Sequence, residues 1–313
     1  MHPTWSPFAW QGIHLLVPSD WNPGKISGEH PSGSVRFDDS HIVRIEMEWK
    51  EARGDDRVGL IVDRYVEGLA KNAQKEKNRL EVERNATCPG LSLPDMRHVE
   101  YFIWRSRFIV YTLACYSPVS DRLLFVRISG RHDENLEAIL PRLFNSLKDT
   151  SIEAPQSWAL YDMTCVSPPG YTLDTFDLKS GHVSLKFLHK NTQLQIDRFS
   201  LAQIILKGRT LQDWFLDFFK KDLRHIHVTN THAETTDNNQ RLIVEGLPKS
   251  RLRALLQPLP FWNVRPRLYL TGRVWTDFSA NKIFVVQTFW KKSEDPPDID
   301  LYCQQVLPTE PKP

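Results

Sequence analysis

Apolar and polar residues alternate along much of the chain, and this pattern predicts a series of short strands. In residues 42–49, for example, apolar side chains occupy every second position and charged ones lie between them, which is typical of a strand with one buried face. In residues 58–69, apolar residues recur at three- and four-residue spacing, which predicts a helix. Further strands are expected at residues 10–17, 34–37, 79–85, 98–104, 108–116 and 123–129.

The first half closes with an apolar helical stripe over residues 136–147. Pro141 lies inside this stripe. Because proline lacks a backbone N–H and fits only the first turn of a helix, it predicts either a kink or the true start of the helix.

The second half of the chain repeats this order. Gly33–Phe37 reads G-S-V-R-F and Gly181–Phe187 reads G-H-V-S-L-K-F, each after a tryptophan and a Pro-rich opening. A helix starting at Thr210, with Asp213 completing its cap, and a late hairpin at 268–290 follow in the same order. We therefore predict a duplication into two similar domains, 1–150 and 151–313. Each is expected to be α+β, a mainly antiparallel sheet with helices packed on its faces.

Short segments in both halves are similar to a known fold family. They are V-P-S-D-W at Val17–Trp21, V-S-P-P-G-Y at Val166–Tyr171 and L-F-N-S-L at Leu143–Leu147, together with the first helix and the late hairpin. In these features the chain resembles the Mog1/PsbP-like proteins over most of both halves. The resemblance implies an α+β sandwich in each half and a role as a non-enzymatic binder or accessory subunit, and it supplies no catalytic residue. The chain departs from the family in being a tandem pair without a transit peptide or lipoprotein signal.

The composition limits the partners that the chain attracts through charge. Its 313 residues include 40 basic and 38 acidic ones, a net charge of +2, so no global field favours nucleic acid or membranes. The four cysteines are far apart in sequence, and no apolar stretch reaches the roughly 18 residues of a membrane span. With no signal peptide evident, these features predict a cytoplasmic protein with free thiols.

The second half contains an insertion, around residues 247–267, between two predicted strands. From Lys249 to Thr276 there is no acidic residue, while arginines and aromatic residues are interleaved. Guanidinium forks bind carboxylate or phosphate groups and aromatic side chains anchor interfaces, so the insertion is a candidate site for an acidic partner, with single-stranded nucleic acid as the less favoured alternative. The alternative is that the arginines alternate outward on solvated strands. The candidate residues are Arg251, Arg253, Trp262, Arg265 and Arg267.

Signatures of catalysis and metal binding are weak. The chain has no Gly-rich phosphate loop and no zinc-protease or nucleophile-elbow motif. His225 and His227 are two apart, so on a strand both imidazoles would share a face, but nothing in the sequence indicates a third ligand. The acidic pairs Asp38-Asp39 and Asp55-Asp56 lie where aspartates cap backbone N–H groups. We therefore predict no metal and no cofactor.

Three classes of function remain open at this stage. The preferred one is a non-enzymatic binding, scaffold or accessory protein that holds a protein or an anionic partner. The alternative is a protein that binds a small molecule or metal in a cleft between its domains, with enzymatic activity left open. The third is a structural subunit of a larger complex.

Overall fold

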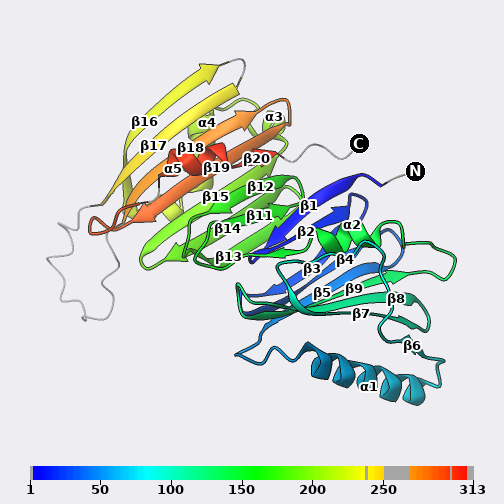
Figure 1. The fold of residues 1–313 in the computed structure, drawn as a ribbon. Helices are drawn as coiled ribbons and strands as arrows, with labels where there is room; N and C mark the ends of the chain where they lie inside the picture. Colours follow the sequence, from blue (N-terminus) through cyan, green and yellow to red (C-terminus); the bar gives the residue numbers. More distant parts are fainter. Residues whose placement is uncertain (1–2, 237–238, 250–267, 297, 309–313) are drawn as a thin grey trace. The chain divides into compact units, whose positions relative to one another are not determined.

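The computed structural model describes residues 3–236, 239–249, 268–296 and 298–308 (Figure 1). The contacts of the chain divide it between Asp162 and Met163 into two compact units, here called unit 1 and unit 2. The sequence had placed this division at residue 150. Each unit is described by itself.

Unit 1 is built on a seven-stranded antiparallel sheet with the order β3-β4-β5-β9-β8-β7-β6. Alternate residues of its central strands are buried, as in β9, where every second side chain from Arg122 to Gly130 is buried. The strands are β3 (Asn22–Gly28), β4 (Ser32–Asp38), β5 (Val43–Glu51), β6 (Glu81–Glu83), β7 (Arg97–Arg105), β8 (Ile109–Ser117) and β9 (Arg122–Gly130).

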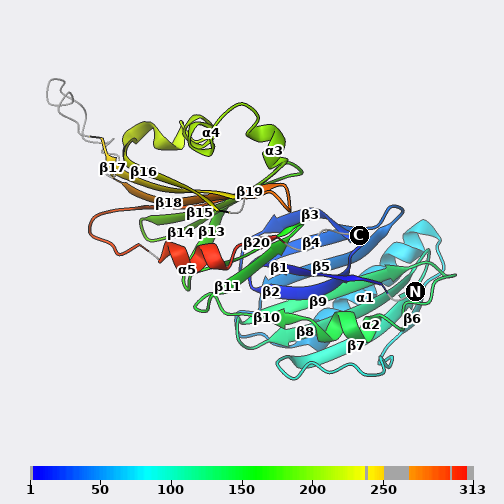
Figure 2. The same cartoon turned by 90° about the horizontal axis from the view of Figure 1, so that it is seen from above.

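One face of this sheet is covered by further strands and a short helix (Figure 2). These are β1 (Trp5–Trp10), β2 (Ile13–Pro18), β10 (Lys148–Asp149), β11 (Gln156–Leu160) and helix α2 (Leu140–Asn145). Phe8 on β1 packs edge-on against Phe37 on β4, with ring centroids 4.9 Å apart. Pro141 lies in the first turn of α2, so the helix starts there rather than at residue 136.

The opposite face of the same sheet is covered by helix α1 (Val58–Glu76). Val58 and Val62 are buried in a small core with Phe102 and Ala114, and Tyr65 packs at its margin. The second half of the helix is polar and exposed, so α1 covers only part of this face.

Unit 2 is built on a seven-stranded antiparallel sheet with the order β13-β14-β15-β19-β18-β17-β16, which corresponds strand for strand to that of unit 1. The strands are β13 (Thr172–Lys179), β14 (His182–His189), β15 (Thr192–Ser200), β16 (Ile226–Thr236), β17 (Asn239–Pro248), β18 (Tyr269–Asp277) and β19 (Lys282–Trp290). The unit also contains the antiparallel pair β12 (Met163–Ser167) and β20 (Leu307–Pro308).

The helices of unit 2 lie on opposite faces of its sheet (Figure 2). Helix α4 (Leu211–Phe218) packs its aromatic side chains on Leu242, Val244 and Leu270, with α3 (Ala202–Ile205) and the 3-10 helix η1 (Asp222–His225) beside it. Thr210 caps α4 as predicted, because its hydroxyl accepts the N–H of Asp213 at 3.0 Å. Helix α5 (Ile299–Gln304) packs on β18 and β19 from the other face.

The predicted α+β class is wrong. Strands account for 50% of the chain and helices for 17%, in three antiparallel sheets, so the protein is mainly β. The error has a local cause: residues 10–17 were assigned to one strand, whereas Gln11 and Gly12, with φ of 52° and 84°, form a two-residue hairpin turn there. Strands β3 and β13, next to the Pro- and Gly-containing segments 18–24 and 167–171, were likewise not predicted. A strand layer therefore covers a sheet face where a helix had been expected.

Candidate functional site

The five residues predicted to contact a partner, Arg251, Arg253, Trp262, Arg265 and Arg267, lie outside the residues that the structure describes. Both ends of the acid-free stretch are described. Lys249 directly follows β17, and Arg273 and Trp275 lie on β18.

The two candidate metal-binding histidines are not on one strand. His225 is the last residue of the 3-10 helix η1, and His227 is an exposed residue near the start of β16. The period of two that would have placed both imidazoles on one face does not apply across this junction. Within the described part of the chain, no group of three or more His, Cys, Asp or Glu residues could hold a metal ion.

A groove of about 280 Å³ lies between strands β16–β18 and helix α5, and Arg273 and Trp275, near the end of the acid-free stretch, line it. Arg241 lies opposite Trp275 and Ile243 lies opposite Arg273 in the register of β17 and β18. Because alternate residues of a strand share a face, two guanidinium groups and two apolar side chains line the same face in a crossed arrangement. Trp275 is held in place by stacking on Phe284, with ring centroids 5.4 Å apart.

The wall of the groove is formed by α5, which an ion pair ties to the sheet. Asp298 caps this helix by accepting the N–H groups of Asp300 and Leu301. Asp300 in turn accepts hydrogen bonds from Nε and Nη2 of Arg273, at 2.7 and 2.9 Å. This bidentate pair neutralises Arg273 and fixes its guanidinium.

Arg241 differs from Arg273 in its surroundings. It is exposed, and among the described residues no carboxylate forms an ion pair with it. Its neighbour across the strand pair, Glu234, instead contacts His232, with 3.1 Å between His232 Nε2 and Glu234 Oε1. Arg241 is therefore the groove's cation that is available to an anionic group from outside.

The groove has the properties of a binding site rather than of a reactive one. Cys303 lines it, but burial raises the pKa of this thiol to about 12. The thiol is then protonated at neutral pH, and a protonated thiol is a poor nucleophile. The groove offers apolar packing on Ile243 and Trp275 and the guanidinium of Arg241, beside the polar side chains of His232, Glu234 and Gln304.

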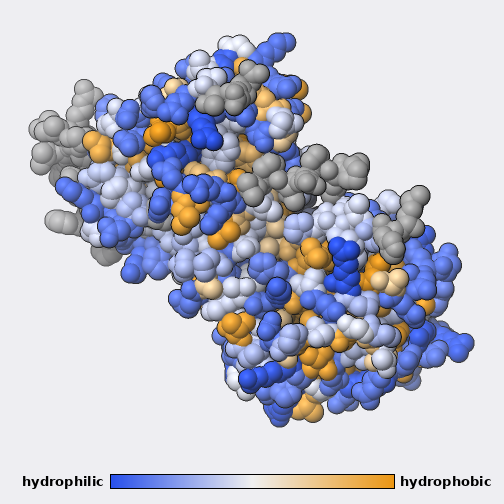
Figure 3. Space-filling view, turned by 45° about the horizontal axis from the view of Figure 1, so that its top comes forward, coloured by the Kyte–Doolittle hydropathy of each residue, from blue (hydrophilic) through white to orange (hydrophobic). Residues whose placement is uncertain are grey.

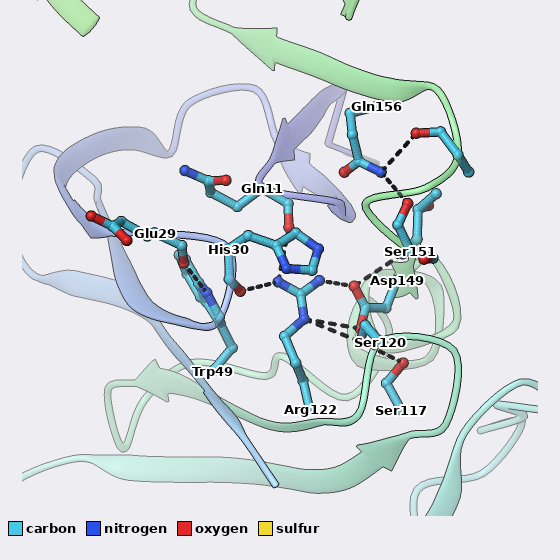
Figure 4. A network of polar contacts seen from close by, with 12 residues as sticks. Gln11, Glu29, His30, Trp49, Ser117, Ser120, Arg122, Asp149, Ser151 and Gln156 are labelled. Carbon is cyan, nitrogen blue, oxygen red and sulfur yellow. Dashed lines mark hydrogen bonds and ion pairs between the residues drawn. The ribbon is translucent and has the colours of Figure 1, made fainter. Parts of the chain in front are cut away.

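A second polar cluster lies in unit 1 and centres on the buried Arg122 (Figure 4). Nη1 of Arg122 donates to the backbone carbonyls of Gln11, at 2.9 Å, and His30, at 2.7 Å. Its Nε donates to the hydroxyl of Ser120 at 3.1 Å, and its guanidinium pairs with Asp149. The cluster joins the turn between β1 and β2, the loop between β3 and β4, the turn before β9 and strand β10.

The surroundings of Arg122 indicate a structural role. Burial, with the nearby charge of Arg122 as a smaller cause, lowers the pKa of His30 and keeps its imidazole neutral. The side chains of Arg122 and Asp149 are 1% and 0% exposed, so an outside molecule does not reach them. No sequence signal indicates this cluster, because its members are distant in sequence: Arg122 alone lies 111 positions from Gln11.

The acidic pairs behave partly as predicted. Asp39 accepts the backbone N–H groups of His41 and Ile42, both at 2.6 Å, and pairs with Arg44. Asp55 pairs with Arg57. Asp55 also accepts the backbone N–H of Arg57 at 3.3 Å, but helix α1 begins without a side-chain cap, so the helix cap expected from Asp55 or Asp56 is not formed.

Comparisons with known proteins leave the family open. No family model and no curated protein matches the chain. Among solved structures, a similar chain is the immunity protein TplEi of T6SS from Pseudomonas aeruginosa, complexed with "L" peptide. The two chains are 9% identical, and the match covers 98% of this chain and 99% of the other at a TM-score of 0.30. A likeness at that level carries no argument, and the resemblance to Mog1/PsbP-like proteins stays a prediction.

One further structural finding concerns membranes. Among the described residues, none of the helices combines the length and the apolar character that spanning a bilayer requires.

Proposed function

We propose that this chain is a non-enzymatic binding or accessory protein, and that the groove of unit 2 holds a segment of a partner protein. The observation that carries the proposal is the crossed arrangement of Arg241, Ile243, Arg273 and Trp275 beside α5. An aromatic or aliphatic side chain of the partner would pack on Ile243 and Trp275. A neighbouring carboxylate would pair with Arg241.

The size of the groove favours a protein segment over a free small molecule. Its volume of about 280 Å³ lies just below the range of roughly 300–1,000 Å³ that is typical of ligand pockets. Such a space fits one or two side chains that are delivered by a larger surface. Figure 3 shows one face of the molecule, on which apolar residues form several separate patches between hydrophilic ones.

The location of the groove is a second source of support. It is lined by β17 and β18, the strands that precede and follow the insertion, and its Arg273 and Trp275 belong to the acid-free stretch. Two arginines of the groove behave differently toward such a partner. Arg273 is engaged by Asp300, whereas Arg241 remains available.

The proposal can be tested by placing a photo-crosslinking amino acid at Ile243. The matched control has the same amino acid at Gln203, an exposed position on α3, outside the groove. Irradiation in an extract of the native host should give a discrete adduct for position 243 and none for position 203. Adding Arg241→Glu should abolish the adduct. An adduct that also forms at position 203, or that survives Arg241→Glu, would contradict the proposal.

A further inference from the structure

The two large sheets have four lateral edges, and three of them carry devices that discourage pairing with another strand. Edge strand β3 contains Pro23 and Lys25 with a bulge between them, and β6 has only three residues. Edge strand β13 contains two aspartates and a lysine and is interrupted by a bulge between Leu173 and Thr175.

The fourth edge, β16, is different. It has 11 residues and no Lys, Arg or Pro (Figure 1). Its bulge, between Val228 and Asn230, lies near its start, and pairing with β17 is then regular over residues 230–236. No described strand pairs with its outer side. A long, regular and weakly charged edge of this kind is a template for an added strand.

The hydrogen-bond pattern shows which groups this edge offers. The N–H of Lys249 donates to the carbonyl of His225 at 2.9 Å, so odd-numbered residues of β17 direct their backbone groups toward β16. The N–H of Gln240 points the other way, to Thr276 on β18, as this alternation requires. It follows that the backbone N–H and C=O groups of Asn230, His232 and Glu234 form their hydrogen bonds with β17.

The remaining residues of the regular stretch, Thr231, Ala233 and Thr235, therefore direct their N–H and C=O groups to the open edge. Ala233 and Thr235 are also exposed as side chains, and Thr231 is partly exposed. Ala233 lies at the midpoint of residues 230–236, so the free backbone groups are arranged symmetrically about it.

We propose that two copies of this chain pair through β16, antiparallel and about a two-fold axis at Ala233. In this register each free N–H meets a free C=O, with Ala233 opposite Ala233 and Thr231 opposite Thr235 of the other copy. The seven-stranded sheet of unit 2 in one copy would then be continuous with the same sheet in the other copy.

Charge selects this register from its neighbours. With the axis at Ala233, His232 of each copy lies opposite Glu234 of the other, on one face of the joined sheet. Both side chains are exposed, at 62% and 55%, and free to adjust. If the two-fold axis lay at residue 234 instead, the two Glu234 carboxylates would lie opposite each other. If it lay at residue 232, the two His232 side chains would be paired. Two Glu234 carboxylates directly opposite each other are destabilising, and the shift that pairs the two His232 side chains loses the favourable contact between His232 and Glu234.

The geometry can be tested by disulfide trapping, with wild type as the control for the four native cysteines. Opposite residues of a hydrogen-bonded pair have Cα atoms about 5.5 Å apart, within the range of a disulfide. Ala233→Cys should give a covalent dimer under mild oxidation. Thr231→Cys alone should not, because the two copies of residue 231 would be about 13 Å apart along the strands. Thr231→Cys combined with Thr235→Cys should restore the crosslink. Equal crosslinking by both single variants, or none by Ala233→Cys, would overturn the proposed register.

The backbone contribution can be tested separately by analytical ultracentrifugation over a concentration series. Ala233→Pro removes an outward N–H that β17 does not use, so unit 2 should fold while dimerisation weakens at least about tenfold. Ala233→Val keeps the N–H and should dimerise at least as well as wild type. A wild-type protein that stays monomeric at every concentration, or an Ala233→Pro variant that dimerises like wild type, would refute the proposal.

The charges supply a third readout. His232→Glu should weaken the dimer, because it places two carboxylates opposite each other, and adding Glu234→Lys should restore it. If neither substitution changes the dimerisation constant, the argument from charge for this register is wrong. His232 and Glu234 line the groove of unit 2, whereas residues 231, 233 and 235 do not, so the Cys and Pro variants are the ones that test the dimer separately from the groove.

Discussion

The guanidinium of Arg122 forms an ion pair with the carboxylate of Asp149, and both side chains are buried. Removing the carboxylate leaves a buried cation without its counter-ion, a change that typically costs about 3–5 kcal/mol. We expect Asp149→Ala to lower the free energy of unfolding by this amount in urea denaturation. The control is the double variant Arg122→Met, Asp149→Leu, which removes both charges and should recover much of the loss. An Asp149→Ala variant as stable as wild type would show that the pair is dispensable.

Gly12 lies in the turn that Arg122 holds, and its backbone excludes a side chain. Its φ is +84°, and a Cβ atom there would lie 2.6 Å from the carbonyl oxygen of Thr150. Gly12→Ala should therefore cost about 1–3 kcal/mol in thermal or urea unfolding. Gly181→Ala is the matched control, because an added Cβ there meets nothing within 4 Å. Equal effects of the two substitutions would contradict the steric argument.

Glu134 should make stability depend on pH in the acid range. Hydrogen bonds from Arg44, at 2.6 and 2.8 Å, are the main cause that lowers the pKa of Glu134 from 4.5 to about 2. Because the pKa is lower in the folded state, the stabilisation is complete above pH 4.5 and is lost as the pH falls toward 2. Unfolding free energies measured across this window should fall less steeply for Glu134→Gln than for wild type. Parallel curves would exclude this contribution.

Helix α4 offers a pair of phenylalanines for testing the core of unit 2. Phe215 is fully buried, whereas Phe218 on the same helix is 46% exposed. Phe215→Ala should cost about 3–5 kcal/mol, because it leaves a cavity against the sheet, and Phe218→Ala should cost clearly less. Urea denaturation monitored by circular dichroism measures both. A larger loss for Phe218→Ala would mean that the helix packs differently.

Much of the local structure could be predicted because its signals are local. The period of two in residues 42–49 corresponds to β5, the helical spacing in residues 58–69 to α1, and Thr210 with Asp213 to the start of α4. The fold class could not be predicted in the same way. Whether a sheet face is covered by a helix or by strands depends on two-residue turns such as Gln11-Gly12. The alternating apolar pattern continues through such a turn and therefore does not reveal it.

The charges of the candidate site could not be predicted either, because they depend on residues that are distant in sequence. Arg273 belongs to the acid-free stretch that the sequence marked, yet its charge is met by Asp300, 27 positions later. Arg241, which precedes that stretch, remains available, and no sequence signal distinguished it. Pairing across a sheet or from a helix to a strand is set by the fold, so the charge that a partner meets cannot be counted along the chain.

The contacts of Arg122 also bear on the order of events during synthesis. The Gln11 carbonyl that it binds is made 111 residues earlier, and Asp149 is made 27 residues later. A ribosome therefore completes nearly the whole of unit 1 before Arg122 can form both its hydrogen bond to the first hairpin and its ion pair with Asp149. Until then the apolar side of β1 and β2 depends on incomplete contacts, and long-range closure of this kind is slow. We expect nascent chains that stop short of residue 149 to be the ones that chaperones hold and proteases cut.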